Sequence, residues 1–124
     1  MNHDAIINQL FEAFKDIRYV SIYQNKQLTY TQREAELEGA SSGDTDRFEE
    51  LLVNPTLLKL AGQRGDIDCG GLDYMIISYG NFFQLVKSIE GGHLSIALEK
   101  GADISSLPGN ILSYVASNFK TLRF

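Results

Sequence analysis

Apolar positions in the first segment of the chain recur at helical spacing. Between Asp4 and Lys15 the large apolar side chains fall three or four residues apart and form one stripe: Ile7, Leu10, Phe11 and Phe14. Polar residues occupy the opposite side, as in a helix that packs one face against a core. Asp4, or Asn2 before it, is the expected N-cap, because a short side-chain acceptor satisfies the first free N–H groups. The pattern predicts a helix over 4–15.

The periodicity changes over residues 18–32. β-branched and aromatic residues dominate 19–23 and 28–31, and these residue types favour strands. The residues between them, Gln24 to Gln27, include Asn25, which tolerates the positive φ that a tight hairpin turn demands. The pattern predicts a β-hairpin.

A polar, acidic segment follows over 33–46, and we expect an exposed linker there. A second helix is predicted next, capped by Thr45 or Asp44. It carries a run of large apolar residues: Phe48, Leu51, Leu52, Leu57, Leu58 and Leu60. Pro55 is expected to end the first piece near Val53 and to begin a second, since proline lacks a backbone donor and clashes with the preceding turn. The glycine-rich stretch 62–71 is expected to close this region.

Three strands are predicted in quick succession over 72–79, 82–90 and 93–99, joined by turns at Gly80-Asn81 and Gly91-Gly92. Both alternating sets of the first strand are apolar, so we expect helices on both faces of the sheet. A last helix from about Ser106 carries apolar residues nearly every fourth position: Leu107, Ile111, Val115, Phe119 and Leu122. The predicted order is α-β-β-α-β-β-β-α, an α+β fold in a single domain, 1–124.

Composition and charge narrow the class of protein. The 124 residues carry 11 Lys and Arg against 16 Asp and Glu, a net charge of −5, so we expect no nucleic-acid partner. The longest apolar runs are about four residues, such as 74–77, far below the ~20 that a membrane span needs, and no membrane insertion is expected. The single Cys69 and the absence of a basic, apolar leader favour a cytoplasmic location.

The chain lacks the common signatures of catalysis and ligand binding. It has no Gly-x4-Gly-Lys-Ser/Thr, Gly-x-Gly-x-x-Gly or Gly-x-Ser-x-Gly segment. Residues 66–71 begin like a calcium loop, but Gly70 and Ile77 occupy the fifth and twelfth positions, where ligands are needed. This segment is expected to be a solvated turn. His3, His93 and Cys69 form no close pairs of the kind that bind zinc, so we expect no metal, no cofactor and no catalytic residues.

Individual polar and aromatic residues have unremarkable expected roles. His93 is expected to be a polar residue at a strand end, and Cys69 a semi-buried structural thiol. Glu49 and Glu50 are expected near the positive end of their helix. The acidic run Glu34, Glu36 and Glu38 reads as a solvated face. The tyrosines of the first hairpin could form a stacking platform for single-stranded nucleic acid, but the chain lacks the net positive charge that this way of binding nucleic acid requires.

One segment and the order of elements resemble the roadblock/dynein light-chain family. The segment is Gly80-Asn81-Phe82-Phe83-Gln84-Leu85-Val86-Lys87-Ser88-Ile89-Glu90-Gly91-Gly92-His93-Leu94-Ser95-Ile96-Ala97-Leu98-Glu99-Lys100, followed by Ala102-Asp103-Ile104 and the last helix. It is similar to that family's paired strands and entry to the C-terminal helix; the N-terminal helix and first hairpin match in place and length. The resemblance implies a five-stranded antiparallel sheet, with the middle helix on one face and the terminal helices on the other.

The resemblance also implies a function. Members of the family form homodimers or pair with a paralogue, bind Ras-like small GTPases or assemble larger complexes, and are not enzymes alone. The excess of apolar surface in this chain favours an oligomer interface from an independent direction. We therefore expect a non-catalytic dimerising regulatory or scaffold module. Its expected interface lies on the middle helix and the following strand: Phe48, Leu51, Leu52, Leu58, Leu72, Tyr74 and Ile76.

Two other classes remain open at this stage. A small-ligand sensory module of PAS- or profilin-like type would have a mixed α/β sheet of the same size, and it predicts a monomer with a bound small molecule. An enzyme that uses His93 and nearby acids is the third.

Overall fold

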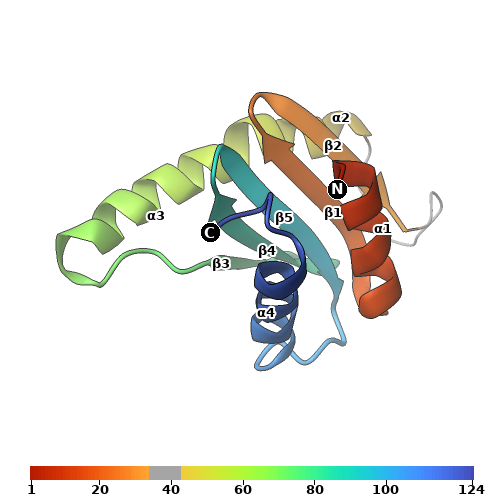
Figure 1. The fold of residues 1–124 in the computed structure, drawn as a ribbon. Helices are drawn as coiled ribbons and strands as arrows, with labels where there is room; N and C mark the ends of the chain where they lie inside the picture. Colours follow the sequence, from red (N-terminus) through yellow and green to blue (C-terminus); the bar gives the residue numbers. More distant parts are fainter. Residues whose placement is uncertain (34–42) are drawn as a thin grey trace.

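The computed structural model describes residues 1–33 and 43–124. It is an α+β fold built on a five-stranded antiparallel sheet with the strand order β2-β1-β5-β4-β3 (Figure 1). The elements, in chain order, are α1 (His3–Ala13), β1 (Ile17–Gln24), β2 (Gln27–Gln32), α2 (Gly43–Phe48), η1 (Glu49–Val53), α3 (Asn54–Asp68), β3 (Met75–Ser78), β4 (Phe82–Ile89), β5 (Gly92–Glu99) and α4 (Leu107–Asn118). The predicted α+β class is confirmed. Most of the linker predicted over 33–46, with Glu34, Glu36 and Glu38, lies outside the described residues.

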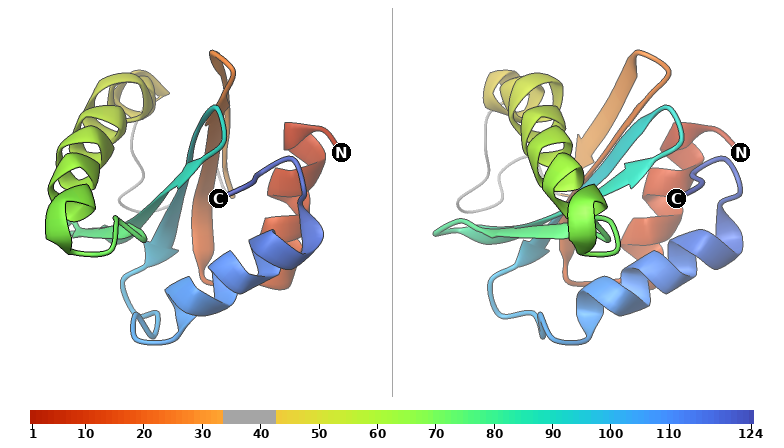
Figure 2. Two further views of the ribbon diagram at one scale, coloured as in Figure 1. Left: turned by 60° about the vertical axis from the view of Figure 1, so that its left-hand side comes forward. Right: turned by 90° about the vertical axis from the view of Figure 1, so that its left-hand side faces the viewer.

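Helices cover both faces of the sheet, as the apolar alternation predicted. The left view of Figure 2 shows α1 and α4 on one face and the α2–α3 rod on the other. The apolar core lies on the α1 and α4 side, where side chains from the two helices meet alternate residues of the central strands: Ile6, Ile7, Leu10, Val20, Ile22, Leu94, Ile96, Leu98, Ile111, Leu112 and Val115. Burying these side chains supplies the main driving force for folding.

The N-terminal elements follow local rules. Asn2 is the N-cap of α1, and its Oδ1 accepts a hydrogen bond from the Ala5 N–H at 2.8 Å. Helix α1 ends at Ala13, two residues before the predicted end. The hairpin turn has positive φ at both central residues, 54° at Asn25 and 70° at Lys26, which is the twist that two-residue hairpin loops require. The predicted hairpin is confirmed.

The middle helix is continuous, and the break predicted at Pro55 is wrong. Phe48 and Asn54, which flank η1, both have right-handed helical dihedral angles. The segment η1 is a π-helical turn, in which the Asn54 N–H bonds to the Glu49 carbonyl five residues earlier. Pro55 cannot donate to Leu51, so widening the helix before it accommodates the missing bond without ending the rod.

Both ends of this rod also differ from the prediction. Thr45 and Asp44, the expected caps, lie inside α2, which is described from Gly43. The glycine-rich stretch does not close the region, because α3 continues through it to Asp68, and Asp66 lies in its last turn. The connection after α3 folds back closely: a Cβ on Gly65 would lie 2.9 Å from the Gly71 carbonyl carbon.

The edge strand β3 is shorter than predicted. The sequence predicted a strand over 72–79, but Leu72 and Tyr74 lie in the irregular connection before Met75. Lys87 on β4 holds this connection, since its Nζ donates to the Asp73 carbonyl at 2.7 Å and to Asp73 Oδ1 at 3.1 Å. Before Met75 the chain is therefore held to β4 through a side chain, and the ladder of backbone hydrogen bonds begins only at Met75.

The tight approach of β1 to the start of β5 yields a first prediction. A Cβ on Gly92 would overlap the Tyr23 carbonyl oxygen, a backbone atom that cannot move without disturbing the β1–β5 ladder. Gly92→Ala is therefore expected to destabilise the protein by more than about 2 kcal/mol, measured by urea unfolding. Gly109→Ala is the matched control, because a Cβ there meets open space in α4 and alanine favours a helix by up to about 1 kcal/mol. Equal losses in both variants would contradict the steric explanation.

Candidate functional site

The sheet face beneath the middle helix is polar at its centre. Register places Ser21 opposite Ser95 and Tyr23 opposite His93, so side chains of β1 and β5 alternate between this face and the apolar core. Gln84 of β4 lies opposite Ala97 on the same face. This face offers hydrogen-bonding groups where a sheet packed on a helix ordinarily offers apolar ones.

The middle helix presents polar residues to that face. Asp46, Glu50, Asn54 and Leu58 are buried and recur every fourth residue. A regular α-helix would rotate each such step away from the sheet, because four residues exceed one turn of 3.6. The wider turn of η1 reduces this drift, so that both Glu50 and Asn54 reach the sheet.

Glu50 lies at the centre of a buried hydrogen-bond network. Its side chain is 0% exposed. Oε2 accepts from the Tyr19 hydroxyl at 2.8 Å, and Oε1 lies 2.8 Å from His93 Nε2 and 2.9 Å from Asn54 Nδ2. An ionised carboxylate can only accept, so with Glu50 ionised this contact requires a proton on His93 Nε2. The network ties the helix to β1 and β5 at one point.

Neighbouring groups extend this network. Asn54 Nδ2 also donates to Ser95 Oγ at 3.3 Å, and Gln84 Nε2 donates to the same oxygen. Within residues 1–33 and 43–124, the buried oxygens Ser21 Oγ and Asn54 Oδ1 have no hydrogen-bond partner. Burial, and next the charge of Glu50, raise the pKa of Tyr19, so its hydroxyl stays protonated and remains a donor.

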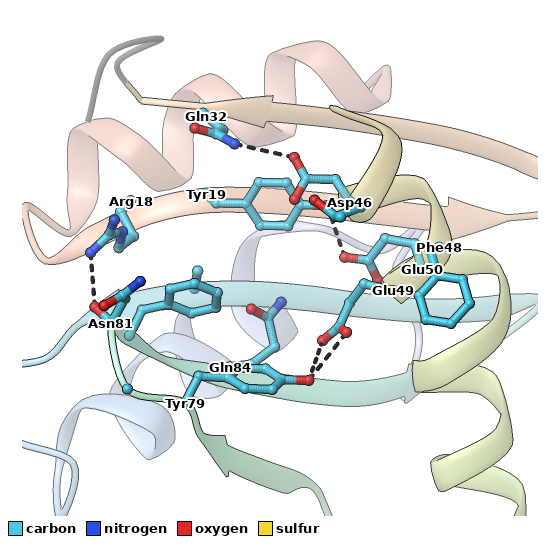
Figure 3. Close-up of a pocket in the computed structure, with 14 residues that line it drawn as sticks. Arg18, Tyr19, Gln32, Asp46, Phe48, Glu49, Glu50, Tyr79, Asn81 and Gln84 are labelled. Atoms are coloured by element: carbon cyan, nitrogen blue, oxygen red, sulfur yellow. Dashed lines mark hydrogen bonds between the residues drawn. The ribbon is translucent and has the colours of Figure 1, made fainter. Parts of the chain in front are cut away.

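A pocket of about 380 Å³ opens beside this network, between the first half of the helix and the sheet (Figure 3). Its lining includes two further carboxyl groups. Asp46 Oδ2 accepts from Gln32 Nε2 at 3.1 Å, and the two carboxylate oxygens of Glu49 lie 3.1 and 3.2 Å from the Tyr79 hydroxyl. The pocket therefore combines acidic groups with aromatic walls.

Arg18, the cation among the described residues of the lining, is already engaged. Arg18 Nη1 donates to the Asn81 carbonyl at 3.1 Å and lies 3.5 Å from Glu99 Oε2. Its guanidinium also stacks over the Phe82 ring, 5.4 Å from the ring centroid. Arg18 thus holds the turn between β3 and β4 against β5.

The pKa values of Glu49, Asp46 and Tyr79 in the pocket are shifted toward the neutral forms of these groups. Burial raises the pKa of Glu49, and the charges of Glu50 and Asp46 raise it further. Burial also raises the pKa of Asp46. Burial and the neighbouring Glu49 charge raise the pKa of Tyr79 to about 12. Each carboxylate makes its neighbour's negative charge less favourable.

The residues predicted for an interface do not form one surface. Phe48, Leu51 and Leu52 are exposed together on α2 and η1. Leu58 lies on the buried side of α3, and Ile76 packs against the apolar core. The remaining two lie in the connection before β3, where Leu72 is half-buried and Tyr74 is exposed.

The sequence analysis missed the buried network. His93, expected to be a polar strand-end residue, is 2% exposed within β5, and Glu50 contacts the sheet instead of merely facing the helix end. The four-residue spacing of Asp46, Glu50 and Asn54 is the signal that could have revealed a buried polar stripe. Cys69 is exposed, not semi-buried as expected. In the described part of the chain, no cluster of three or more His, Cys, Asp or Glu is arranged to hold a metal ion.

Comparisons with known proteins do not show a family for this chain. No protein-family model matches it, and no curated protein matches it. Across residues 1–33 and 43–124, every helix is too short or too polar to span a membrane.

The Glu50 network yields a second prediction. Glu50→Ala removes the acceptor from three buried donors at once, which is expected to destabilise the protein by about 3 kcal/mol or more. Urea unfolding at pH 7, followed by circular dichroism, measures the loss.

Glu49→Gln is the matched control, one residue away. Because the pKa of Glu49 is raised in the folded state, the native protein binds this proton more tightly than the unfolded chain does. The contribution of Glu49 to the free energy of unfolding therefore falls as the pH rises from the ordinary glutamate pKa, about 4, through its raised pKa in the folded state. The glutamine variant is expected to be at least as stable as the parent at pH 7, with the difference vanishing below about pH 4. A loss equal to that of Glu50→Ala would contradict the distinct role of Glu50.

Proposed function

We propose that this protein is a non-catalytic dimerising module with a regulatory or scaffold role, and that the outer face of the middle helix is its self-association surface. One observation carries the proposal. Along α2, η1 and α3, large apolar side chains are exposed on the helix while polar ones are buried beneath it: Phe48, Leu51, Leu52, Leu57, Leu60 and Ile67. We call these six residues the outer stripe.

The exposure of the outer stripe is high for residues of this type. Phe48 is 58% exposed, Leu52 55% and Leu60 60%. Single exposed apolar side chains are common, but six of them along one helical rod support a surface that another molecule covers. Covering the stripe would bury apolar area that folding of one chain leaves in water.

A second copy of the chain fits this surface. The helical rod spans 43–68, about 40 Å at 1.5 Å per residue, and an apolar ridge is complementary to an identical ridge about a two-fold axis. The end of α3 extends beyond β3, the edge strand (Figure 1). Among residues 1–33 and 43–124, β3 pairs with β4 alone, and one partner copy beside the other edge of β3 would meet both that edge and the overhanging helix.

The resemblance to the roadblock/dynein light-chain family supports the same proposal. The α+β class and the five-stranded antiparallel sheet are compatible with the resemblance, and members of that family dimerise, with themselves or with a paralogue. On this basis we extend the proposal to the partner: the dimer binds a Ras-like small GTPase or assembles a larger complex.

The pocket beside Glu49 favours a second candidate, the small-ligand sensory module. Its volume lies within the range of small-molecule sites, roughly 300–1,000 Å³. An enzyme based on His93 has less support, because that side chain is buried and its Nε2 is held by Glu50.

The dimer proposal predicts a monomeric variant. The double substitution Leu52→Glu and Leu60→Glu places charges on the outer stripe without removing buried side chains, so the chain is expected to remain folded and to dissociate. Light scattering coupled to gel filtration should give twice 13.8 kDa for the parent and 13.8 kDa for the variant. Ile104→Glu, an exposed apolar residue before α4, is the control and should remain dimeric. A monomeric parent, or a dimeric double variant, would contradict the proposed interface.

The GTPase proposal is tested separately with purified Ras-like GTPases, each loaded with GDP or with a non-hydrolysable GTP analogue. Biolayer interferometry on the immobilised parent is expected to show binding that prefers one nucleotide state, as a regulator requires a differential affinity for the two states. Equal affinity for both states would favour a scaffold. The absence of binding by every GTPase would reject this partner class and leave the dimer result unaffected.

A further inference from the structure

The pocket beside Glu49 is built from rigid elements. Side chains from β1, β4, α2 and η1 line it, together with the turn between β3 and β4. Sites on regular elements hold their groups more precisely than loops do. The chemistry of the lining therefore indicates what the pocket accepts.

The pocket is rich in acceptors and in negative charge. Among the described residues of its lining, the carboxyl groups of Asp46, Glu49 and Glu50 stand against one guanidinium, that of Arg18. Arg18 also contacts the Asn81 carbonyl and Glu99, so the described lining carries more acidic than basic groups. Glu49 contacts only the Tyr79 hydroxyl among the described hydrogen bonds. Ionised carboxylates in a half-buried site are stabilised by a cation that donates hydrogen bonds.

Gln84 supplies an independent indication of a ligand. Its side chain is 3% exposed and lines the pocket, and its Nε2 donates to Ser95 Oγ. Among the residues that the structure describes, none donates to the Gln84 amide oxygen. Figure 3 shows the amide pointing from β4 into the pocket. This oxygen faces the pocket, so a ligand that donates a hydrogen bond there would pair with it.

Aromatic rings complete the lining. Tyr79 and Phe82 lie side by side with centroids 5.4 Å apart, and Phe48 and Tyr19 contribute two further rings. Rings of this kind pack against an apolar stem and attract a positive charge through their π faces. The ligand that suits this pocket has a donor-rich cationic end and a short apolar stem.

We propose that this pocket binds an organic cation, a guanidinium or primary ammonium on a short apolar stem, whose N–H groups donate to Glu49 and to the Gln84 amide oxygen. The cation has two possible sources, a free small molecule or an arginine or lysine side chain of a bound protein. The proposal does not depend on dimerisation, because its acceptors belong to one chain.

The experiment titrates the full chain with matched probes, followed by calorimetry and by amide shifts in NMR spectra. Agmatine and butylguanidine carry the cation on an apolar stem, and butylurea is the neutral counterpart of the latter. Both cations are expected to bind saturably, with shifts concentrated at 46–50 and 79–84, and butylurea is expected to bind at least tenfold more weakly.

Variants connect the binding to the pocket. Glu49→Gln removes one charged acceptor and is expected to weaken agmatine binding at least tenfold, while its thermal melt establishes that it remains folded. Glu12→Gln, an exposed residue of α1 on the opposite side of the sheet, makes the same change in net charge and should bind as the parent does.

A capped Gly-Arg-Gly peptide distinguishes the two sources of the cation. Tighter binding of the peptide than of agmatine identifies a protein side chain as the occupant, and the reverse identifies a free small molecule. The proposal is overturned if neither cation nor peptide binds with a dissociation constant below about 1 mM, if butylurea binds as well as butylguanidine, or if Glu49→Gln binds like the parent.

Discussion

The carboxyl group of Glu50 is fully enclosed, and donors from β1, β5 and the next turn of its own helix converge on it. Placing such a group inside a protein is unfavourable unless its hydrogen bonds are made. Once they are made, losing the alignment of helix and sheet would break them together. This requirement fixes the position of the middle helix on the sheet more strictly than apolar contact alone would, because apolar packing has little directionality.

The polarity of the middle helix follows from this arrangement. A helix on a sheet ordinarily turns its apolar side inward, but here the inward positions include Asp46, Glu50 and Asn54. The large apolar residues are left for the outer side. The π-helical turn η1 makes this possible, because it keeps four-residue spacing directed at the sheet and also tolerates Pro55.

The parts of the fold that local rules determine could be predicted from the sequence. The hairpin turn at Asn25 needs only positive φ at its central residues, and the stripe of α4 needs only helical spacing. The same rules gave a wrong result at Pro55. A π-helical turn can replace a break in the helix there, and the sequence pattern does not indicate which of the two forms. The strand predicted from Leu72 was too long, and the contact between Asp73 and Lys87 that holds this connection joins residues 14 positions apart, which periodicity does not reveal.

The candidate site is held together by contacts between residues far apart in the sequence, and for that reason the sequence did not reveal it. His93 and Glu50 lie 43 positions apart, and their contact depends on the register of β5 and on the rotation of the helix, neither of which periodicity specifies. The pair Glu49 with Tyr79, 30 positions apart, has the same character. The outer stripe was partly foreseen, because Phe48, Leu51 and Leu52 are apolar regardless of which side of the helix faces the sheet.

Because the middle helix buries polar residues and exposes apolar ones, it also connects the outer stripe with the pocket beside Glu49. Polar residues directed inward leave the space beside Glu49 lined by acceptors, and apolar residues directed outward leave the stripe to be covered. Phe48 belongs to both, since it lines the pocket and is exposed on the stripe. A second copy seated on the stripe would therefore cover one wall of the pocket, so that self-association and access to the acidic groups share a side chain. A single structural constraint, the enclosed Glu50, thus accounts both for the apolar residues on the outer side of the helix and for the acceptors that line the adjoining pocket.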